Sequence, residues 1–143
     1  MSRQLARETA FKMIFQMDVG KNALEVAERT MEEALDEGLI KKRDTAYILE
    51  LVAGVADKKD ELDAFIAEHA KGWTLDRINV IEKNLIRLAL YEIRHMENIP
   101  YEVSVNEAIE LAKRYGEDDA YSFVNGILDK ARPPKTADRE NAK

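Results

Sequence analysis

Two cations and two aromatic rings follow one another at four-residue intervals near the start of the chain. They are Arg3, Arg7, Phe11 and Phe15. In a helix this spacing places them on one slanting stripe of the surface. Single-stranded RNA is commonly held by such a set, because arginines neutralise phosphates and bases stack on the rings. The alternative is that both rings belong to the core and both arginines are merely solvated, and the spacing alone favours that alternative.

The other chemically versatile side chains do not form a catalytic or metal site. His69 and His95 are the only histidines and lack the four-residue spacing of a helical metal site. Helix capping and solvation explain the acidic residues 117–119. A nucleophile, a base and an orienting group cannot be assembled at a recognisable spacing. The sequence therefore predicts a protein that is not an enzyme and that binds no metal or cofactor.

The composition is typical of a single-domain protein of the cytoplasm. A chain of 143 residues corresponds to one domain with a real hydrophobic core. The absence of cysteine fits a reducing compartment, and the start "MSRQLARETAFK" has no apolar run of the signal-peptide type. No stretch approaches the length of a membrane span, so we expect a soluble protein. The net charge of -6 argues against nucleic-acid binding by the whole surface but allows a local basic site.

The elements that must position these residues are helices, because helical periodicity runs through the chain and no segment alternates like a strand. The pattern predicts helices over 3–19, 22–38 and 42–55 and one around 62–66. It then predicts a short and a long helix within 73–96, a break at Pro100, and two final helices that end near Gly116 and before Pro133. Asn22 with Glu25, and Ser104 with Glu107, have the spacing of capping boxes, and Asp118 or Asp119 should cap the last helix.

The stretch "SFVNGILDK" contains Asn125 and Gly126, a dipeptide typical of hairpin turns. Phe123 and Ile127 lie four residues apart, as do Val124 and Leu128, so the dipeptide should lie inside the last helix. Glycine there costs about 1 kcal/mol relative to alanine. We therefore expect Gly126 to be packed closely against another helix.

These elements add up to an all-α domain of about seven helices in two packed sub-bundles. The domain should span residues 1–132, and the polar segment 133–143 should be a disordered tail.

Several sequence blocks, taken in order, resemble a known family. They are "RLALYE", "IPYEV", "NEAIELAK" and "FVNGILD", preceded by "ARETAFKMIFQMD" and "LVAGV". Together they resemble the NusB family of bacterial transcription antitermination factors. The resemblance implies a protein that binds the boxA-type single-stranded element of nascent ribosomal RNA together with the ribosomal protein NusE, and that joins a transcription complex through other Nus factors. It leaves open a homodimer of the free protein.

The resemblance also implies roles for particular residues. Those expected to bind RNA are Arg3, Arg7, Lys12, Phe15, Asp119 and Phe123, and those expected to bind the ribosomal protein are Asp76 and Glu82. Each of these assignments has an alternative that fits equally well. Asp119 could be a helix cap, Phe123 could be a core residue, and the two carboxylates expected to bind the partner could simply be solvated. The chain departs from the family at its start, where only two arginines precede Lys12, whereas relatives often carry a denser cluster.

Two other functions fit the same helical pattern. One is a protein-interaction adaptor without RNA contact. The other is a stand-alone relative of the RNA-binding domain found in ribosomal RNA cytosine methyltransferases. The chain has no cysteine that could serve as the methyltransferase nucleophile, so neither alternative makes it an enzyme.

Overall fold

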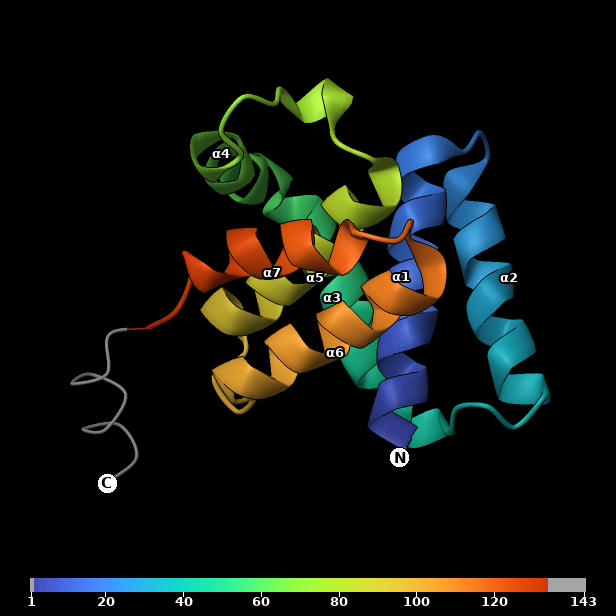
Figure 1. Cartoon of the computed structure of the whole chain (residues 1–143). Coiled ribbons are helices and arrows are strands. Elements are labelled where there is room, and N and C mark those ends of the chain that lie inside the picture. The colour runs from blue at the N-terminus through green and yellow to red at the C-terminus, as the bar shows by residue number, and fades with distance from the viewer. Residues whose placement is uncertain (1, 134–143) are drawn as a thin grey trace.

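The computed structural model describes residues 2–133, which form seven α-helices and no strand (Figure 1). The helices are α1 (Ser2–Val19), α2 (Ala23–Asp36), α3 (Thr45–Asp57), α4 (Lys59–His69), α5 (Val80–His95), α6 (Tyr101–Tyr115) and α7 (Ala120–Asp129). Two short 3-10 turns, η1 (Lys42–Asp44) and η2 (Leu75–Arg77), precede α3 and α5. The predicted all-α fold is confirmed, and so is the short helix before the long one. The predicted tail lies outside the described residues, apart from Pro133.

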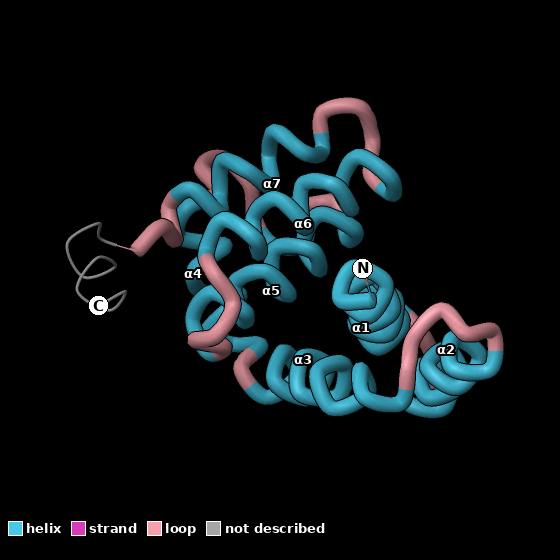
Figure 2. The backbone as a smooth tube through the Cα atoms, turned by 90° about the horizontal axis from the view of Figure 1, so that it is seen from below, coloured by secondary structure: helices cyan, strands magenta, loops and turns pink. Residues whose placement is uncertain are grey.

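The helices form two groups that meet along α1 and α5 (Figure 2). In the first group α1 packs against α2 and α3, and in the second α5 packs against α4, α6 and α7. The stretch from Asn84 to Glu92 in α5 is buried at every position, as expected of a helix that is surrounded by others. The two predicted sub-bundles thus share α5 as their central element.

A buried carboxylate connects four of the helices. Glu92 of α5 is fully buried and accepts hydrogen bonds from Arg7 Nε at 2.9 Å, from Ser104 Oγ at 2.8 Å and from the Tyr47 hydroxyl. Burial opposes the charge on Arg7, but the neighbouring Glu92 outweighs it and raises the arginine pKa. Burial and Glu92 together raise the pKa of Tyr47. Since buried charges need such partners, this cluster fixes α1, α3 and α6 relative to α5.

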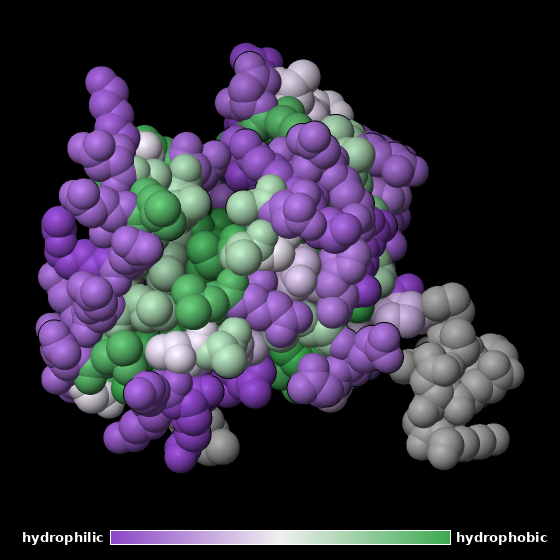
Figure 3. Space-filling model, turned by 180° about the vertical axis from the view of Figure 1, so that it is seen from behind, coloured by the Kyte–Doolittle hydropathy of each residue, from purple (hydrophilic) through white to green (hydrophobic). Residues whose placement is uncertain are grey.

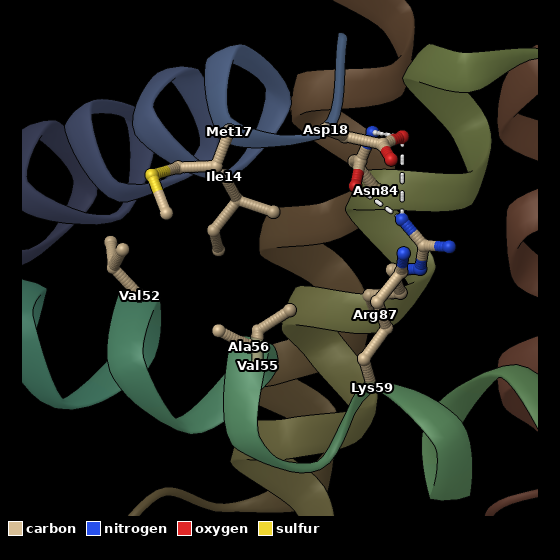
Figure 4. A pocket seen from close by; sticks show the side chains of 9 residues that line it. All are labelled: Ile14, Met17, Asp18, Val52, Val55, Ala56, Lys59, Asn84 and Arg87. Carbon is tan, nitrogen blue, oxygen red and sulfur yellow. Dashed lines mark hydrogen bonds and ion pairs between the residues drawn. The ribbon is translucent and has the colours of Figure 1, made fainter. Parts of the chain in front are cut away.

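A second polar cluster closes one end of a cavity of about 200 Å³ between α1, α3 and α5 (Figure 4). Arg87 donates to both carboxylate oxygens of Asp63 in α4, at 2.7 and 2.9 Å, and to Asn84 Oδ1 at 3.0 Å. Asn84 in turn donates to Asp18 in α1 at 3.1 Å. Burial opposes ionisation of Asp18, but the bond from Asn84 and the charge of Arg87 lower its pKa. The cluster therefore ties α4 and the end of α1 to the central helix.

The face behind that of Figure 1 carries a strip of apolar side chains between polar ridges (Figure 3). Leu49 of α3 and Leu24 of α2 are among the large apolar side chains that remain exposed on the molecule. Apolar surface of this kind is typical of interaction surfaces.

The predicted capping boxes are wrong. Asn22 has a left-handed backbone conformation (φ 53°) and its side chain makes no capping bond. Ser104 lies inside α6, which begins at Tyr101, because Pro100 supplies the fixed φ and the missing N–H that suit a helix start. The Ser104 hydroxyl is therefore free to bond Glu92. Asp119 does precede α7, but its side chain makes no capping bond.

The prediction for the Asn-Gly dipeptide is half right. Asn125 and Gly126 lie inside α7, as expected. A Cβ added to Gly126 would meet nothing within 4 Å, so the expected close packing is absent and the glycine faces open space. The close approach occurs instead at Gly54 of α3, where a Cβ would collide with the ring of Tyr91 in α5.

Candidate nucleic-acid interface

Three adjoining hollows form one groove across the ends of several helices. The α1 hollow, of about 240 Å³, is lined by Phe11, Lys12, Phe15, Gln16, Ile81 and Tyr115. The middle hollow, of about 410 Å³, is lined by Asn79, Ile81, Tyr115, Gly116, Glu117 and Asp118. The Trp73 cleft, of about 280 Å³, is lined by Trp73, Arg77, Ile78, Asn79, Glu82, Asp119 and Phe123. Because each hollow shares lining residues with the next, the three hollows of this groove adjoin one another from α1 to α7.

The α1 hollow contains two of the predicted RNA-binding residues. Lys12 is exposed, and Phe15 is half-buried against the core. Phe11 is buried and packs between Phe15 and Tyr115, with ring centroids 6.3 and 5.5 Å apart, so this ring belongs to the core. The hollow therefore offers the partly buried rings of Phe15 and Tyr115 beside one cation.

Tyr115 forms the part of the groove shared by the α1 hollow and the middle hollow. Its hydroxyl donates to Glu8 of α1, and burial together with Glu8 raises the tyrosine pKa to about 12. Arg114 also donates to Glu8 at 2.8 Å. The ring is thus held in place by a bond between α6 and α1, and it remains a neutral hydroxyl at physiological pH.

The two arginines of the amino-terminal stripe are separated by the fold. Arg7 is 1% exposed and pairs with Glu92, so the expectation that it neutralises RNA phosphates is contradicted by its burial. Arg3 is exposed, and its guanidinium lies over the Tyr47 ring at 4.1 Å. Neither arginine lines the groove. Sequence spacing put both on one face, but the position of the Glu92 carboxylate decides which of them is buried.

The Trp73 cleft brings together residues that were assigned to different ligands. Asp119 and Phe123, expected to bind RNA, line it together with Glu82, expected to bind the ribosomal protein. Burial raises the pKa of Glu82, and the nearby carboxylates of Asp119 and Glu117 raise it further. Asp76 is exposed on η2 outside the cleft, where it accepts a hydrogen bond from Thr74 Oγ1 at 2.6 Å.

Two residues of the cleft were missed by the sequence reasoning. Trp73 is 54% exposed, and Arg77 is exposed as well. The sequence held one usable signal, since "GWTLDR" places the only tryptophan of the chain between a glycine and a 3-10 turn. An aromatic residue in a loop segment is a stronger functional hint than one in a helix core.

The described residues hold no group of three or more side chains suited to bind a metal ion. Among residues 2–133, no helix combines the length and the apolar character that a membrane crossing requires.

Comparison with known proteins gives concordant matches. A family model described as the NusB family matches residues 4–133. A Bacillus subtilis (strain 168) relative, described as transcription antitermination protein NusB, is 45% identical over 90% of this chain and 92% of its own. A Halalkalibacterium halodurans relative with the same description is 42% identical over 91% and 92%.

Solved structures agree with these relatives. T. maritima NusB superposes with a TM-score of 0.79 at 36% identity, over 94% of both chains. A chain from a crystal structure of antitermination factors NusB and NusE in complex with dsRNA superposes with a TM-score of 0.78 at 28% identity, over 92% of this chain and 98% of that chain.

Proposed function

The chain belongs to the NusB family, and we propose that it is a transcription antitermination factor of the cytoplasm that binds boxA-type RNA together with the ribosomal protein NusE. The RNA is a single-stranded element of nascent ribosomal RNA, and its capture supports the transcription and processing of that RNA. The relatives described as transcription antitermination proteins support this function, as does the solved complex of antitermination factors NusB and NusE with dsRNA. Other Nus factors complete the complex.

The groove of three adjoining hollows is the single observation that carries the proposal. It joins Lys12 and Phe15 on α1 to Asp119 and Phe123 beside and within α7, although these pairs are far apart in the sequence. Single-stranded RNA needs a track with aromatic faces for its bases and cations for its phosphates. The groove offers both, and Arg3 lies beyond it at the start of α1.

The partner protein binds next to the RNA. Glu82 lies in the same cleft as Asp119, and Asp76 lies on the neighbouring 3-10 turn. A small ribosomal protein is normally basic, so the negative potential of these carboxylates complements its positive charge. The shared cleft means that RNA and protein meet along one edge, and binding of either one helps to order the site for the other.

A titration of fluorescently labelled boxA-type RNA tests the function, with NusE present or absent and at several salt concentrations. Phe15→Ala should weaken binding by about 1–3 kcal/mol without changing the salt dependence, because a stacking ring carries no charge. Lys12→Ala should flatten the plot of log affinity against log salt by about 0.7. Arg29→Ala, an exposed cation on α2, is the matched control and should change neither quantity.

Three results would count against the proposal. Wild-type protein that fails to bind the RNA even with NusE would leave the adaptor without RNA contact as the function. Equal affinity for the single strand and for a duplex of the same sequence would show that exposed bases are not recognised. If the single strand is bound without any dependence on NusE, the stand-alone RNA-binding relative of the methyltransferase domain is favoured.

A further inference from the structure

Trp73 has a backbone that is fixed by a hydrogen bond and a side chain that is exposed. It is the only tryptophan of the chain and is 54% exposed in the connection between α4 and α5. Its backbone N–H donates to the carbonyl of Ala70 at 3.0 Å, directly after Gly72, whose φ of +81° turns the chain. An indole buries a large apolar area in a core, so an indole that is left exposed is typical of a contact surface.

The walls of the Trp73 cleft combine a second ring with hydrogen-bond acceptors. Phe123 is half-buried and lines the cleft with Trp73. The carboxylates of Glu82 and Asp119 line it too, and neither has a hydrogen-bond or ion-pair partner among the described residues. The side-chain oxygen Oδ1 of Asn79 is occupied, because it accepts from the backbone N–H of Ile81 at 2.8 Å. The cleft therefore presents aromatic faces and two unused acidic acceptors.

We propose that the Trp73 cleft receives one unpaired RNA base, which stacks on Trp73 and turns its N–H donors toward Asp119 and Glu82. This inference rests on the proposed function and deepens it, since it names the part of the RNA that this cleft reads. A phosphate would be repelled by the two carboxylates, so the base enters the cleft and its phosphate stays outside near Arg77. Base stacking on an aromatic ring is the common mode of single-strand capture.

The acceptors make guanine the preferred base. An ionised carboxylate only accepts hydrogen bonds, and guanine presents an imino and an amino N–H side by side on its Watson–Crick edge. Adenine and cytosine offer an amino group next to an acceptor. Uracil offers a single N–H between two carbonyl oxygens, which would face the carboxylates. The cleft should therefore bind guanine most tightly, adenine and cytosine less tightly, and uracil least tightly.

An arginine of the protein partner is the competing occupant, because a guanidinium also stacks on tryptophan and pairs with carboxylates. Arg77 argues for the base, since it already lines the cleft and would repel a second guanidinium.

The single tryptophan makes the test specific to the cleft. Wild-type protein is titrated with a short single-stranded boxA-type RNA and with NusE, separately and together, while tryptophan emission and the anisotropy of labelled RNA are recorded. RNA should quench the emission, with the same midpoint as the anisotropy change. Trp73→Ala should weaken RNA binding by about 5- to 150-fold, the value expected for one stacked base, at an unchanged salt slope. Tyr121→Ala, which removes an exposed ring outside the groove, should have no effect.

Replacing each guanine of the RNA in turn by inosine removes only the exocyclic amino group. One of these replacements should weaken binding to the wild type by about tenfold, because a good base contact is worth about that much. Asp119→Asn should reduce the guanine-to-inosine ratio at that position, whatever it does to overall affinity.

Three outcomes would overturn the inference. Tight RNA binding without any change in tryptophan emission would show that the cleft is empty in the complex and would leave the proposed function intact. Quenching by NusE alone, with no further effect of RNA, would assign the cleft to a side chain of the partner. Equal affinities for all guanine-to-inosine RNAs would remove the base preference. By contrast, failure of the wild type to bind RNA at all would contradict the proposed function itself.

Discussion

Arg3 and Arg7 lie on one stripe of α1, but they do different physical work. Arg7 donates from Nε to Glu92, while its Nη2 has no hydrogen-bond partner within the described part of the chain. Arg3 keeps an exposed guanidinium over the Tyr47 ring. The buried arginine serves the fold, and the exposed one remains a candidate contact for phosphate.

Arg7→Met should lower the free energy of unfolding by about 3–5 kcal/mol, since it leaves a buried carboxylate without its counter-charge. Arg3→Met is the matched control and should change stability by no more than about 0.5 kcal/mol. Urea unfolding followed by circular dichroism gives both values. A loss below about 1 kcal/mol for Arg7→Met would mean that Tyr47 and Ser104 suffice to hold Glu92.

Glu82→Gln should stabilise the free protein at neutral pH. The folded state raises the pKa of this carboxyl through burial and through Asp119 and Glu117, so its ionised form is less favourable folded than unfolded. The gain, of up to about 0.5 kcal/mol, should be full at pH about 7 and disappear as the pH falls below the ordinary glutamate pKa of about 4.3. Thermal melts at both pH values measure it. Glu32→Gln on α2 controls for net charge, and a gain that is independent of pH would contradict the explanation.

At the scale of the helices, two glycines have opposite packing. Gly126→Ala should raise the free energy of unfolding by about 0.5–1 kcal/mol, because α7 gains helix propensity and the new methyl group meets nothing. Gly54→Ala should lower it by about 1–3 kcal/mol, because the methyl group collides with the buried ring of Tyr91. Denaturant titrations of the two variants compare them directly. Similar effects from both would show that propensity alone governs these sites.

Helix positions could be predicted from the sequence because apolar spacing is a local property. The first helix was expected over 3–19 and is found at Ser2–Val19, and the last one contains Asn125 and Gly126 as expected. The start of α6 was predicted wrongly, whereas Asn22 and Asp119 do occupy the N-cap positions of α2 and α7. Ser104 has the right spacing to Glu107 for a capping box, but α6 begins earlier, directly after Pro100. Where a helix begins depends on the turn that precedes it, which the spacing of the cap residues does not show.

The candidate site was predictable only in part, because some of its features depend on contacts between residues that are far apart in the sequence. The resemblance indicated Phe15, Asp119 and Phe123, and the fold places all three in the groove. Whether Arg7 is buried depends on Glu92, which lies 85 residues away in the sequence. The exposure of Trp73 depends on how the connection from α4 to α5 crosses the surface, which local spacing does not determine.

At the scale of the whole molecule, the charges are unevenly distributed. The net charge is -6, yet Arg3 and the basic residues 41–43 have no ion-pair partner among the described residues, and η1 packs against α1. In Figure 1 the start of α1 lies beside η1, at the opposite end of α1 from the connection to α2. The acidic residues 117–119 and Glu82 instead surround the groove. The groove therefore presents carboxylates that suit a basic partner, and Lys12 and Arg77 are the cations in its lining that can meet phosphate.

Glu117→Gln combined with Asp118→Asn should slow association with NusE several-fold at low salt and leave the dissociation rate nearly unchanged, because exposed charges steer encounter more than they hold the complex. Stopped-flow mixing at low and high ionic strength measures the rates, and the difference should shrink as salt screens the field. Asp36→Asn combined with Glu37→Gln makes the same change in charge at the end of α2 and should have no comparable effect. Equal effects of the two pairs would mean that only net charge matters.

The buried Glu92 also determines how the molecule opens. Its three donors come from α1, α3 and α6, so moving any one of these helices away would strand a charge or a polar group in the interior. Local opening of these helices is therefore costly. Their slowest backbone amides should exchange with solvent only when the whole core unfolds, so hydrogen exchange should give the same opening free energy for all of them. Amides of α2, which has no bond to Glu92, should exchange through smaller openings. The groove between α1 and α6 then keeps its shape until the entire core unfolds.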